Sequence, residues 1–516
     1  MGVTSASRAL ATLVFVLQSI TLRSACVAAC TVASLVLPVS NAHASNEAML
    51  KLLRILRDRG SISADEYDEL RLSAEAPDAA AAPAVPGGQV LPAPAATPAL
   101  ETQDAAVKIQ PTEQALDTRV QDLERQVAQQ DPEAAVKKAL TNKWYERLGL
   151  RGYTQFRFTQ VARREGAALE VPADRSVNEN ESFVIRRGRF VVSGDVSQHL
   201  ALYAQADFNA STGAADYSLQ MRDLYADVNL DENKAFRVRL GQSKVPFGWV
   251  NMQSSQNRGP VERPDALNSA VEGERDYGAY LMWAPPVVRQ RYRDLVSQGL
   301  KGSGDYGAVA VGLYSGQGLN RSDQNGDPHV IARWSYPFKL PSGQFFEIGA
   351  QAYHGKFVTS TQAISTGGVT FTPSSPADGV IDERVALTAV WYPQPIGVEV
   401  EWNVGRSPEL SDDYRSIGRK SLSGGYVQVN YRKARGTASL FPFVRWQYYD
   451  GARKFARNAP REHINEVDFG LELAKWTELE LTMIYTRTFE RTRTSLFPYA
   501  SSRDANRLGF QVQWNY

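Results

Sequence analysis

Arginine is the residue type whose spacing in this sequence most clearly predicts chemistry. Two pairs stand two residues apart, so both members of each pair would lie on the same side of a β-strand. An arginine keeps its charge and presents a planar fork that matches a phosphate or a carboxylate. Ladders of such groups along a water-filled channel would favour anions. Six arginines share the polar positions of early segments: Arg151, Arg157, Arg187, Arg189, Arg237 and Arg239.

The same arginines have a second interpretation, because acids occupy polar positions nearby. Pairing with Asp207, Asp223 and Asp227 would give a channel without anion preference. Catalytic patterns are weak by comparison, since the histidines are scattered and no HExxH or Gly-x-Ser-x-Gly pattern occurs. The GxGxxG run at 302–307 precedes a strand-like segment, so we interpret it as a turn. We therefore predict a protein that is not an enzyme and needs no cofactor.

The elements that must position these arginines are β-strands. Residues 508–516 alternate between large apolar side chains and the set Gly, Gln, Gln and Asn. An edge strand of a soluble sandwich, the alternative, would usually carry a charge or proline. A strand of an outer-membrane barrel instead faces lipid on one side and an aqueous lumen on the other. The pattern favours a last strand that closes a barrel against the first strand.

Segments with this alternation recur from Trp144 onward, and we count sixteen candidate strands. They lie at 147–160, 182–195, 199–209, 220–230, 234–243, 276–284, 305–316, 328–336, 344–357, 382–392, 396–404, 423–433, 438–450, 464–475, 477–489 and 505–516. Short turns alternate with long polar segments such as 160–181, as in barrels with short periplasmic turns and long outer loops. The predicted fold is all-β: a transmembrane antiparallel barrel of about sixteen strands over 141–516, wide enough for an aqueous channel.

Composition agrees with a barrel and argues against other classes. The 516 residues carry 57 basic and 56 acidic side chains, and this balance argues against nucleic acid as a partner. Mean hydropathy is −0.34, too low for a helical membrane protein. A barrel is compatible with that value because half of each strand is polar.

The first residues predict export across the inner membrane. Residues 1–44 resemble a signal peptide, with an apolar run at 25–37 and an A-x-A cleavage pattern at 42–44. Both cysteines, Cys26 and Cys30, would leave with it, so the mature chain would have no thiol chemistry.

A short helical region is predicted between the signal and the barrel. Residues 45–73 have the pattern of a helical hairpin, and 74–111 form an Ala/Pro-rich linker. Residues 112–140 predict a short coiled-coil helix, which is either a lone solvated helix or an oligomerisation stalk. An alternative function of another class is structural, with this arm tethering the outer membrane to the cell wall.

Motifs between residues 183 and 278 resemble one family in combination. They are FVIRRGRF at 183–190, RDLYAD at 222–227, VRLGQSKVPFG at 238–248, Glu262-Arg263 and RDYG at 275–278. Together they resemble the phosphate-selective porin O and P family, and the resemblance covers roughly 145–516. It implies a sixteen-stranded, homotrimeric porin of the bacterial outer membrane.

The resemblance also implies roles for individual residues. Arg186, Arg187 and Arg189 would lie at the pore constriction, with Asp223 nearby. Arg186 and Arg187 are neighbours, so a regular strand cannot direct both into the lumen. Either a bulge intervenes or Arg186 lies above the lipid band.

The third outer loop, at about 249–275, is expected from the resemblance to fold into the lumen. Phosphate-specific members complete the anion site with lysines from this region. Here the segment after Lys244 has none, and Arg258 and Arg263 follow instead. We therefore expect passive diffusion of small anions, phosphate or others, or of other small hydrophilic solutes. A general or carbohydrate-type porin without a phosphate site is the alternative.

Overall fold

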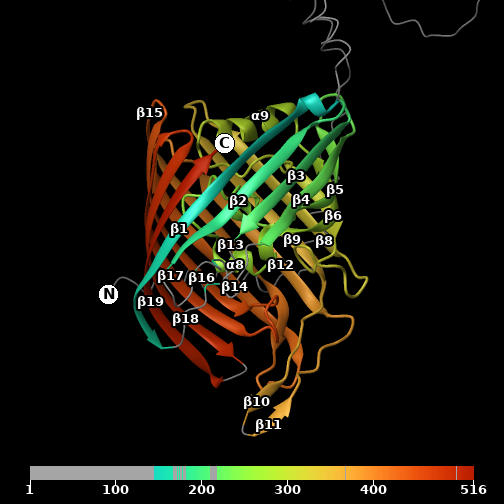
Figure 1. Ribbon diagram of the computed structural model, residues 1–516. Coiled ribbons are helices and arrows are strands. Elements are labelled where there is room, and N and C mark those ends of the chain that lie inside the picture. The colour runs from blue at the N-terminus through green and yellow to red at the C-terminus, as the bar shows by residue number, and fades with distance from the viewer. Residues whose placement is uncertain are drawn as a thin grey trace, which may run out of the picture. The chain divides into compact units, whose positions relative to one another are not determined.

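Sixteen antiparallel strands form a closed β-barrel in the computed structural model (Figure 1). The structure describes residues 144–166, 171, 174, 177, 182–209, 218–366, 368–494 and 497–516. The barrel strands are β1 (Leu148–Gly166), β2 (Ser182–Asp195), β3 (Leu200–Asn209), β4 (Ser218–Asn229), β5 (Phe236–Lys244), β6 (Arg275–Trp283), β7 (Val309–Tyr314), β8 (His329–Lys339), β9 (Phe345–Phe357), β12 (Val380–Trp391), β13 (Ile396–Leu410), β14 (Ile417–Tyr431), β16 (Ala438–Ala452), β17 (Arg461–Trp476), β18 (Leu479–Thr494) and β19 (Phe497–Asn515). Each predicted segment overlaps one of these strands, so the predicted barrel is confirmed.

The first and last strands close the barrel, as the alternation of residues 508–516 predicted. Phe158 lies opposite Phe510 in the antiparallel register of β1 and β19. The backbone nitrogen of Gly152 donates to the carbonyl oxygen of Tyr516 at 2.6 Å, and Tyr516 donates back at 3.0 Å. A Cβ atom at Gly152 would lie 2.4 Å from the Tyr516 ring, so this close approach requires glycine.

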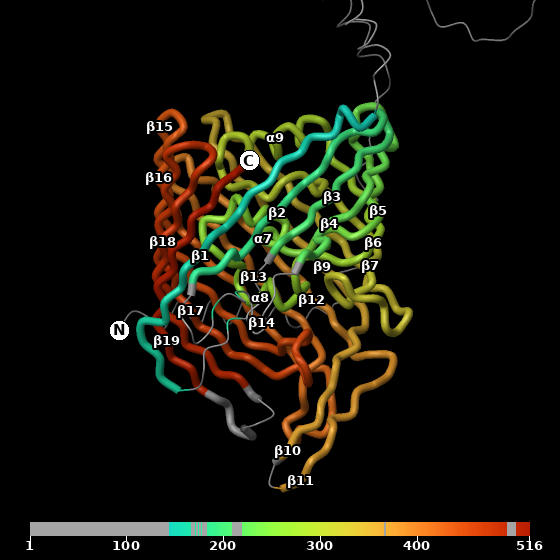
Figure 2. Tube along the Cα trace, viewed as in Figure 1, coloured from blue at the N-terminus to red at the C-terminus, as the bar shows by residue number. Residues whose placement is uncertain are grey.

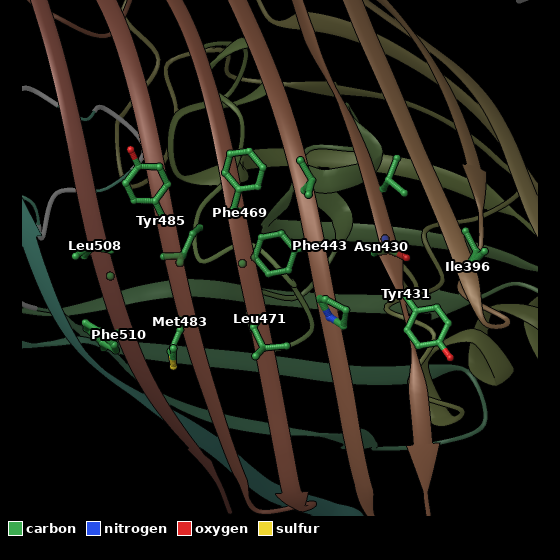
Figure 3. Close-up of a pocket in the computed structure, with 16 residues that line it drawn as sticks. Ile396, Asn430, Tyr431, Phe443, Phe469, Leu471, Met483, Tyr485, Leu508 and Phe510 are labelled. Atoms are coloured by element: carbon green, nitrogen blue, oxygen red, sulfur yellow. The ribbon is translucent and has the colours of Figure 1, made fainter.

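Side chains alternate between an apolar outer face and a polar interior. Phe510 and Trp514 of β19 are 45% and 39% exposed, whereas Gln511 between them is buried. The outer face from β13 to β19 also carries an apolar depression of about 720 Å³, around which Figure 3 shows Phe469 and Tyr485. An apolar outer band is what a barrel in a bilayer requires.

The connections differ between the two ends of the barrel. One end has the short turns 196–199, 230–235, 340–344, 392–395 and 477–478. The other end has the longer segments, and one of them carries a small hairpin of β10 (Ile364–Thr366) and β11 (Val369–Phe371). Short turns face the periplasm in bacterial barrels. The three-residue β15 (Lys433–Arg435) lies in the turn between β14 and β16, and η1 (Trp144–Arg147) precedes β1.

Residues 245–274, here called the lumen loop, run through the barrel interior. They contain α7 (Trp249–Met252), α8 (Asp265–Asn268) and the short helix η2 (Glu272–Glu274), and Figure 2 shows α7 and α8 inside the barrel. Glu401 of β13 accepts hydrogen bonds from the backbone nitrogens of Trp249 at 2.6 Å and Val250 at 3.1 Å. Because this carboxylate satisfies unpaired amides at the start of α7, it fixes the loop to the wall. The expectation that this loop folds inward agrees with the structure.

A second segment, residues 284–308, enters from the end with the short turns; it is here called the inner-mouth segment. It contains α9 (Pro286–Ser297), which lies at the same end as β15 in Figure 1. Tyr292 and Leu295 of α9 are buried. The segment reaches the lumen loop, because the Gln253 side-chain nitrogen donates to the Lys301 carbonyl oxygen at 2.6 Å. This helix was not predicted from the sequence.

Among the described residues, no helix is both long and apolar enough to cross a membrane. The predicted signal peptide at 1–44, hairpin at 45–73, linker at 74–111 and coiled-coil helix at 112–140 lie outside the described residues.

Candidate functional site

A β-bulge in β2 directs two neighbouring arginines toward the barrel interior. Gln155 of β1 pairs with Arg187, but Phe156 pairs with Ile185, so Arg186 is an extra residue on β2. A bulge of this kind re-aims side chains without breaking the strand. Arg187 is 5% exposed. Of the two arrangements considered for Arg186, the structure has the bulge.

Three guanidinium groups of the wall meet one carboxylate of the lumen loop. The Glu262 carboxylate lies 3.0 Å from Arg157 Nη1, 3.0 Å from Arg186 Nε and 2.6 Å from Arg187 Nη2. Asp174 also pairs with Arg157, at 2.7 Å. Burial raises the pKa of the Glu262 carboxyl group, but the three arginines outweigh burial and hold it well below its usual range.

A second bulge repeats this arrangement on β4. Gln205 pairs with Asp223 and Ala206 pairs with Met221, so Arg222 is the extra residue. Arg222 donates to the carbonyl oxygen of Gly273 in the lumen loop at 2.9 Å. Both bulges therefore place an additional arginine against this loop.

The second loop carboxylate, Glu274, is surrounded by four cations. It contacts Lys244 at 3.5 Å and Arg263 at 3.0 Å, and it also pairs with Arg258 and Arg275. Burial raises the pKa of Glu274, and these four cations outweigh burial and lower the pKa well below its usual range. Burial in turn lowers the pKa of Arg263 to about 10, which leaves it charged at neutral pH.

Asp223 belongs to this second cluster rather than to the Arg186–Arg187 cluster. Its carboxylate lies 3.0 Å from Arg275. The Lys244 amine donates to three backbone carbonyl oxygens at the end of α7, at 2.8, 3.2 and 2.8 Å. Lys244 therefore holds the loop in place, and its donors are already used.

The remaining predicted arginines also carry defined partners. Arg189 pairs with Asp207 at 3.0 Å, Arg239 with Asp227 at 2.7 Å, and Arg237 with Asp305 of the inner-mouth segment at 2.7 Å. Arg189 and Arg239 are therefore paired with acids, as the second interpretation of the arginines expected. Arg151 is exposed, and its guanidinium carbon lies 5.9 Å from the Tyr203 ring centre.

Tyr153 of β1, Tyr203 of β3 and Tyr225 of β4 contact one another, an arginine or the lumen loop. Tyr203 and Tyr225 stack on each other at 5.0 Å, and Arg239 covers Tyr225 at 3.9 Å. The Tyr153 hydroxyl is hydrogen-bonded to Ser255 of the lumen loop at 2.5 Å.

Among the described residues, the interior face of the remaining strands, β7 to β19, is acidic and is here called the acidic wall. Its buried interior carboxyl groups are Glu347, Asp382, Glu399, Glu401, Glu409, Glu462, Glu466, Asp468, Glu472 and Glu490, and they outnumber the buried arginines Arg333, Arg384, Arg445, Arg503 and Arg507. The lumen loop therefore contacts the basic groups of β1–β6 and, through Glu401 of β13, the acidic wall. Among the described residues, no group of three or more His, Cys, Asp or Glu side chains could hold a metal ion.

Sequence reasoning did not select Glu262, Glu274, Arg222 or Arg275 as site residues. A signal for Arg222 was present, because Arg222 and Asp223 are adjacent charged residues in an alternating strand, as Arg186 and Arg187 are. Glu262 and Glu274 had no such signal, since a loop has no period from which the direction of a side chain can be inferred.

Comparisons with known proteins give one family match and several similar folds. A family model described as phosphate-selective porin O and P matches residues 168–514. Similar structures include OmpT, an outer membrane protein of Vibrio cholerae (9% identity, TM-score 0.43, covering 72% of this chain and 97% of that chain), and an anion-selective porin from Comamonas acidovorans (10%, 0.40, 72% and 99%). No curated protein matches the chain.

Proposed function

Because the chain belongs to the phosphate-selective porin O and P family, we propose that it is an outer-membrane porin that passes small hydrophilic solutes and prefers anions. The chain lies in the bacterial outer membrane. Its family and fold are those of a channel rather than an enzyme. Solutes would cross by diffusion through the water-filled part of the barrel.

The observation that carries the anion preference is an excess of cations between the lumen loop and the wall of β1–β6. Among the described residues, the ion-pair clusters of this region have nine basic groups and five acidic ones. The buried acids Asp265 and Asp276 reduce the excess to two, and the potential stays positive. The basic groups are Arg157, Arg186, Arg187, Arg189, Arg222, Lys244, Arg258, Arg263 and Arg275, and the acids are Asp174, Asp207, Asp223, Glu262 and Glu274.

The acidic wall opposes this preference, because a carboxylate that accepts hydrogen bonds from neutral amides keeps its charge. Glu401 is used to hold α7, and Glu399 accepts hydrogen bonds from Gln428 and Asn430 at 3.0 Å each. A general porin without selectivity is the second candidate, favoured by the ion pairs that the arginines make.

The test is the zero-current potential of the refolded protein in a planar bilayer across a KCl gradient. We expect chloride preference. In R187A/R189A that preference should fall about fivefold for each lost charge, from ~1 kcal/mol per charge in a watery channel. The control R419A/R435A removes two arginines that are exposed. Cation preference in the wild type would refute the proposal, and no preference would favour the general porin.

We also propose that the chain assembles as a homotrimer, which rests on the family resemblance. Chemical cross-linking in detergent, followed by mass measurement, tests this proposal. A monomer at all protein concentrations would reject it. The cell-wall tether remains a prediction, because its arm lies outside the described residues.

A further inference from the structure

Glu262 occupies a position that resembles that of a bound oxyanion. Its carboxylate comes from the lumen loop, whereas all three arginines around it come from β1 and β2. Arg187 Nη2 donates to both carboxylate oxygens, at 2.8 and 2.6 Å. Charge-assisted contacts of this kind are the usual way in which arginine recognises a carboxylate or a phosphate.

The wall holds two of these arginines in place by contacts that do not involve Glu262. Arg187 Nη1 donates to the Gln155 side-chain oxygen at 2.7 Å. Arg157 donates from Nε and Nη2 to the Gln511 side-chain oxygen at 3.1 and 2.6 Å. Their guanidinium groups are therefore oriented by the barrel itself, and such preorganisation favours binding of a matching ligand.

The backbone of the loop is held at this point by the other wall. Arg445 of β16 donates to the carbonyl oxygen of Glu262 at 2.7 Å. The backbone of Glu262 is thus fixed by β16, while its side chain reaches the arginines of β1 and β2. The anchored backbone therefore keeps the carboxylate within reach of the three arginines.

Glu274 differs from Glu262 in the origin of its cations. Arg258 and Arg263, two of its partners, belong to the lumen loop itself. That cluster holds the loop together internally. Of these two sites, the Glu262 site takes all its arginines from the wall and is filled from the loop. Asp174 lies beside it and pairs with Arg157 at 2.7 Å and Arg186 at 3.3 Å.

We propose that Glu262 is a resident carboxylate that fills a three-arginine oxyanion site and so prevents the pore from binding small oxyanions there. This inference rests on the proposed porin function, because only in a porin does the occupied site affect the passage of anions. With Glu262 in place, anions pass along the positive wall without being bound tightly at these arginines. With the carboxylate neutralised, Arg157, Arg186 and Arg187 would hold a small oxyanion such as inorganic phosphate.

The test is Glu262→Gln, which keeps the size of the side chain and removes its charge. In planar bilayers, inorganic phosphate should block the current of E262Q at a concentration at least ~10-fold lower than in the wild type, because about 1.4 kcal/mol of added anion binding gives that factor. The matched control is Glu399→Gln, which removes one interior carboxylate that accepts hydrogen bonds from neutral amides. E399Q should show the wild-type response to phosphate.

A second measurement covers the case in which E262Q folds poorly. Folded barrel is measured by its mobility on unheated gels after refolding in phosphate or in chloride of equal ionic strength. Phosphate should raise the yield and the thermal midpoint of E262Q and leave those of the wild type and E399Q unchanged. Equal values in the two salts, or equal block of all three proteins, would overturn the inference.

Failure of the porin proposal gives a different result. Cation preference in the wild type would refute the anion-preferring function, but phosphate-dependent stabilisation of E262Q would still support the oxyanion site. Chloride preference without any phosphate effect on E262Q would retain the proposed function and reject the role of Glu262.

Discussion

Arg384 offers a direct test of how the lumen loop is held inside the barrel. This β12 residue is fully buried and donates to the carbonyl oxygens of Ala266 and Ser269 at 3.0 Å each, and to the Ser269 hydroxyl at 2.9 Å. Arg384→Gln removes the charge and shortens the side chain. The glutamine has one amide group and cannot serve both carbonyl oxygens in the same way.

The expected effect is local release of α8. A buried carbonyl oxygen that loses its donor costs about 1–3 kcal/mol. This cost applies to Ser269, because the Ala266 carbonyl oxygen also accepts from the Ser269 hydroxyl at 3.1 Å and from the Asn403 side chain at 3.3 Å. Even the lower value would raise the population of the undocked loop about fivefold. Backbone hydrogen exchange measures this population through Asn268 and Ser269, whose amides donate to Pro264 at 3.0 Å and Asp265 at 2.8 Å.

Single-channel recordings provide the functional readout. R384Q should show more frequent current fluctuations than the wild type, because a released loop moves within the lumen. The control is Arg333→Gln, since Arg333 lies in the barrel wall with Glu347 as its ion-pair partner at 3.9 Å. Unchanged exchange at Asn268 and Ser269 in R384Q, or an equal rise in R333Q, would refute the reasoning.

Two further predictions concern the outer rim and the wall. Burial lowers the pKa of Lys454 to about 8 against the attraction of Asp382, so the docked loop 453–460 holds this proton less well than an undocked one. Docking should therefore strengthen as pH rises from 8 toward 10.5. The ratio of Asn458 amide protection in the wild type to that in K454M should rise over the same range. Gly470→Ala should lower the thermal midpoint of the barrel, at a cost of about 1–3 kcal/mol, because its Cβ would lie 2.0 Å from the Phe443 ring.

Each of these predictions has a clear contrary result. A wild-type to K454M protection ratio that stays constant from pH 7 to 9 would show that Lys454 does not titrate in this range. The control for Gly470 is Gly418→Ala, where a Cβ meets no atom within 4 Å. Equal thermal midpoints for the two alanine variants would show that the wall relaxes around the added methyl group.

The strands could be predicted from the sequence because each of them has a local period. Phe510 is exposed and its neighbour Gln511 is buried. Such a two-residue repeat can be recognised from adjacent residues alone. The β2 bulge was partly predictable for the same reason. Arg186 and Arg187 break the repeat, and a break of this kind marks either a bulge or a residue outside the bilayer.

The partners of the arginines could not be predicted in the same way. The contact between Arg187 and Glu262 spans 75 positions and depends on the path of a loop that has no repeat. The helix α9 was missed for another reason. Val288, Tyr292 and Leu295 recur at helical spacing behind Pro286, but this stripe is short and lies where barrels usually have tight turns.

The contact between Gln253 and Lys301 affects how the pore could be widened by protein engineering. It joins a loop that enters from outside the cell to a segment that enters from the periplasm. Shortening either one alone would leave the other in the passage, at the depth where they now meet. Admission of larger molecules would therefore require cuts at both mouths, and a single deletion should change selectivity more than the size limit.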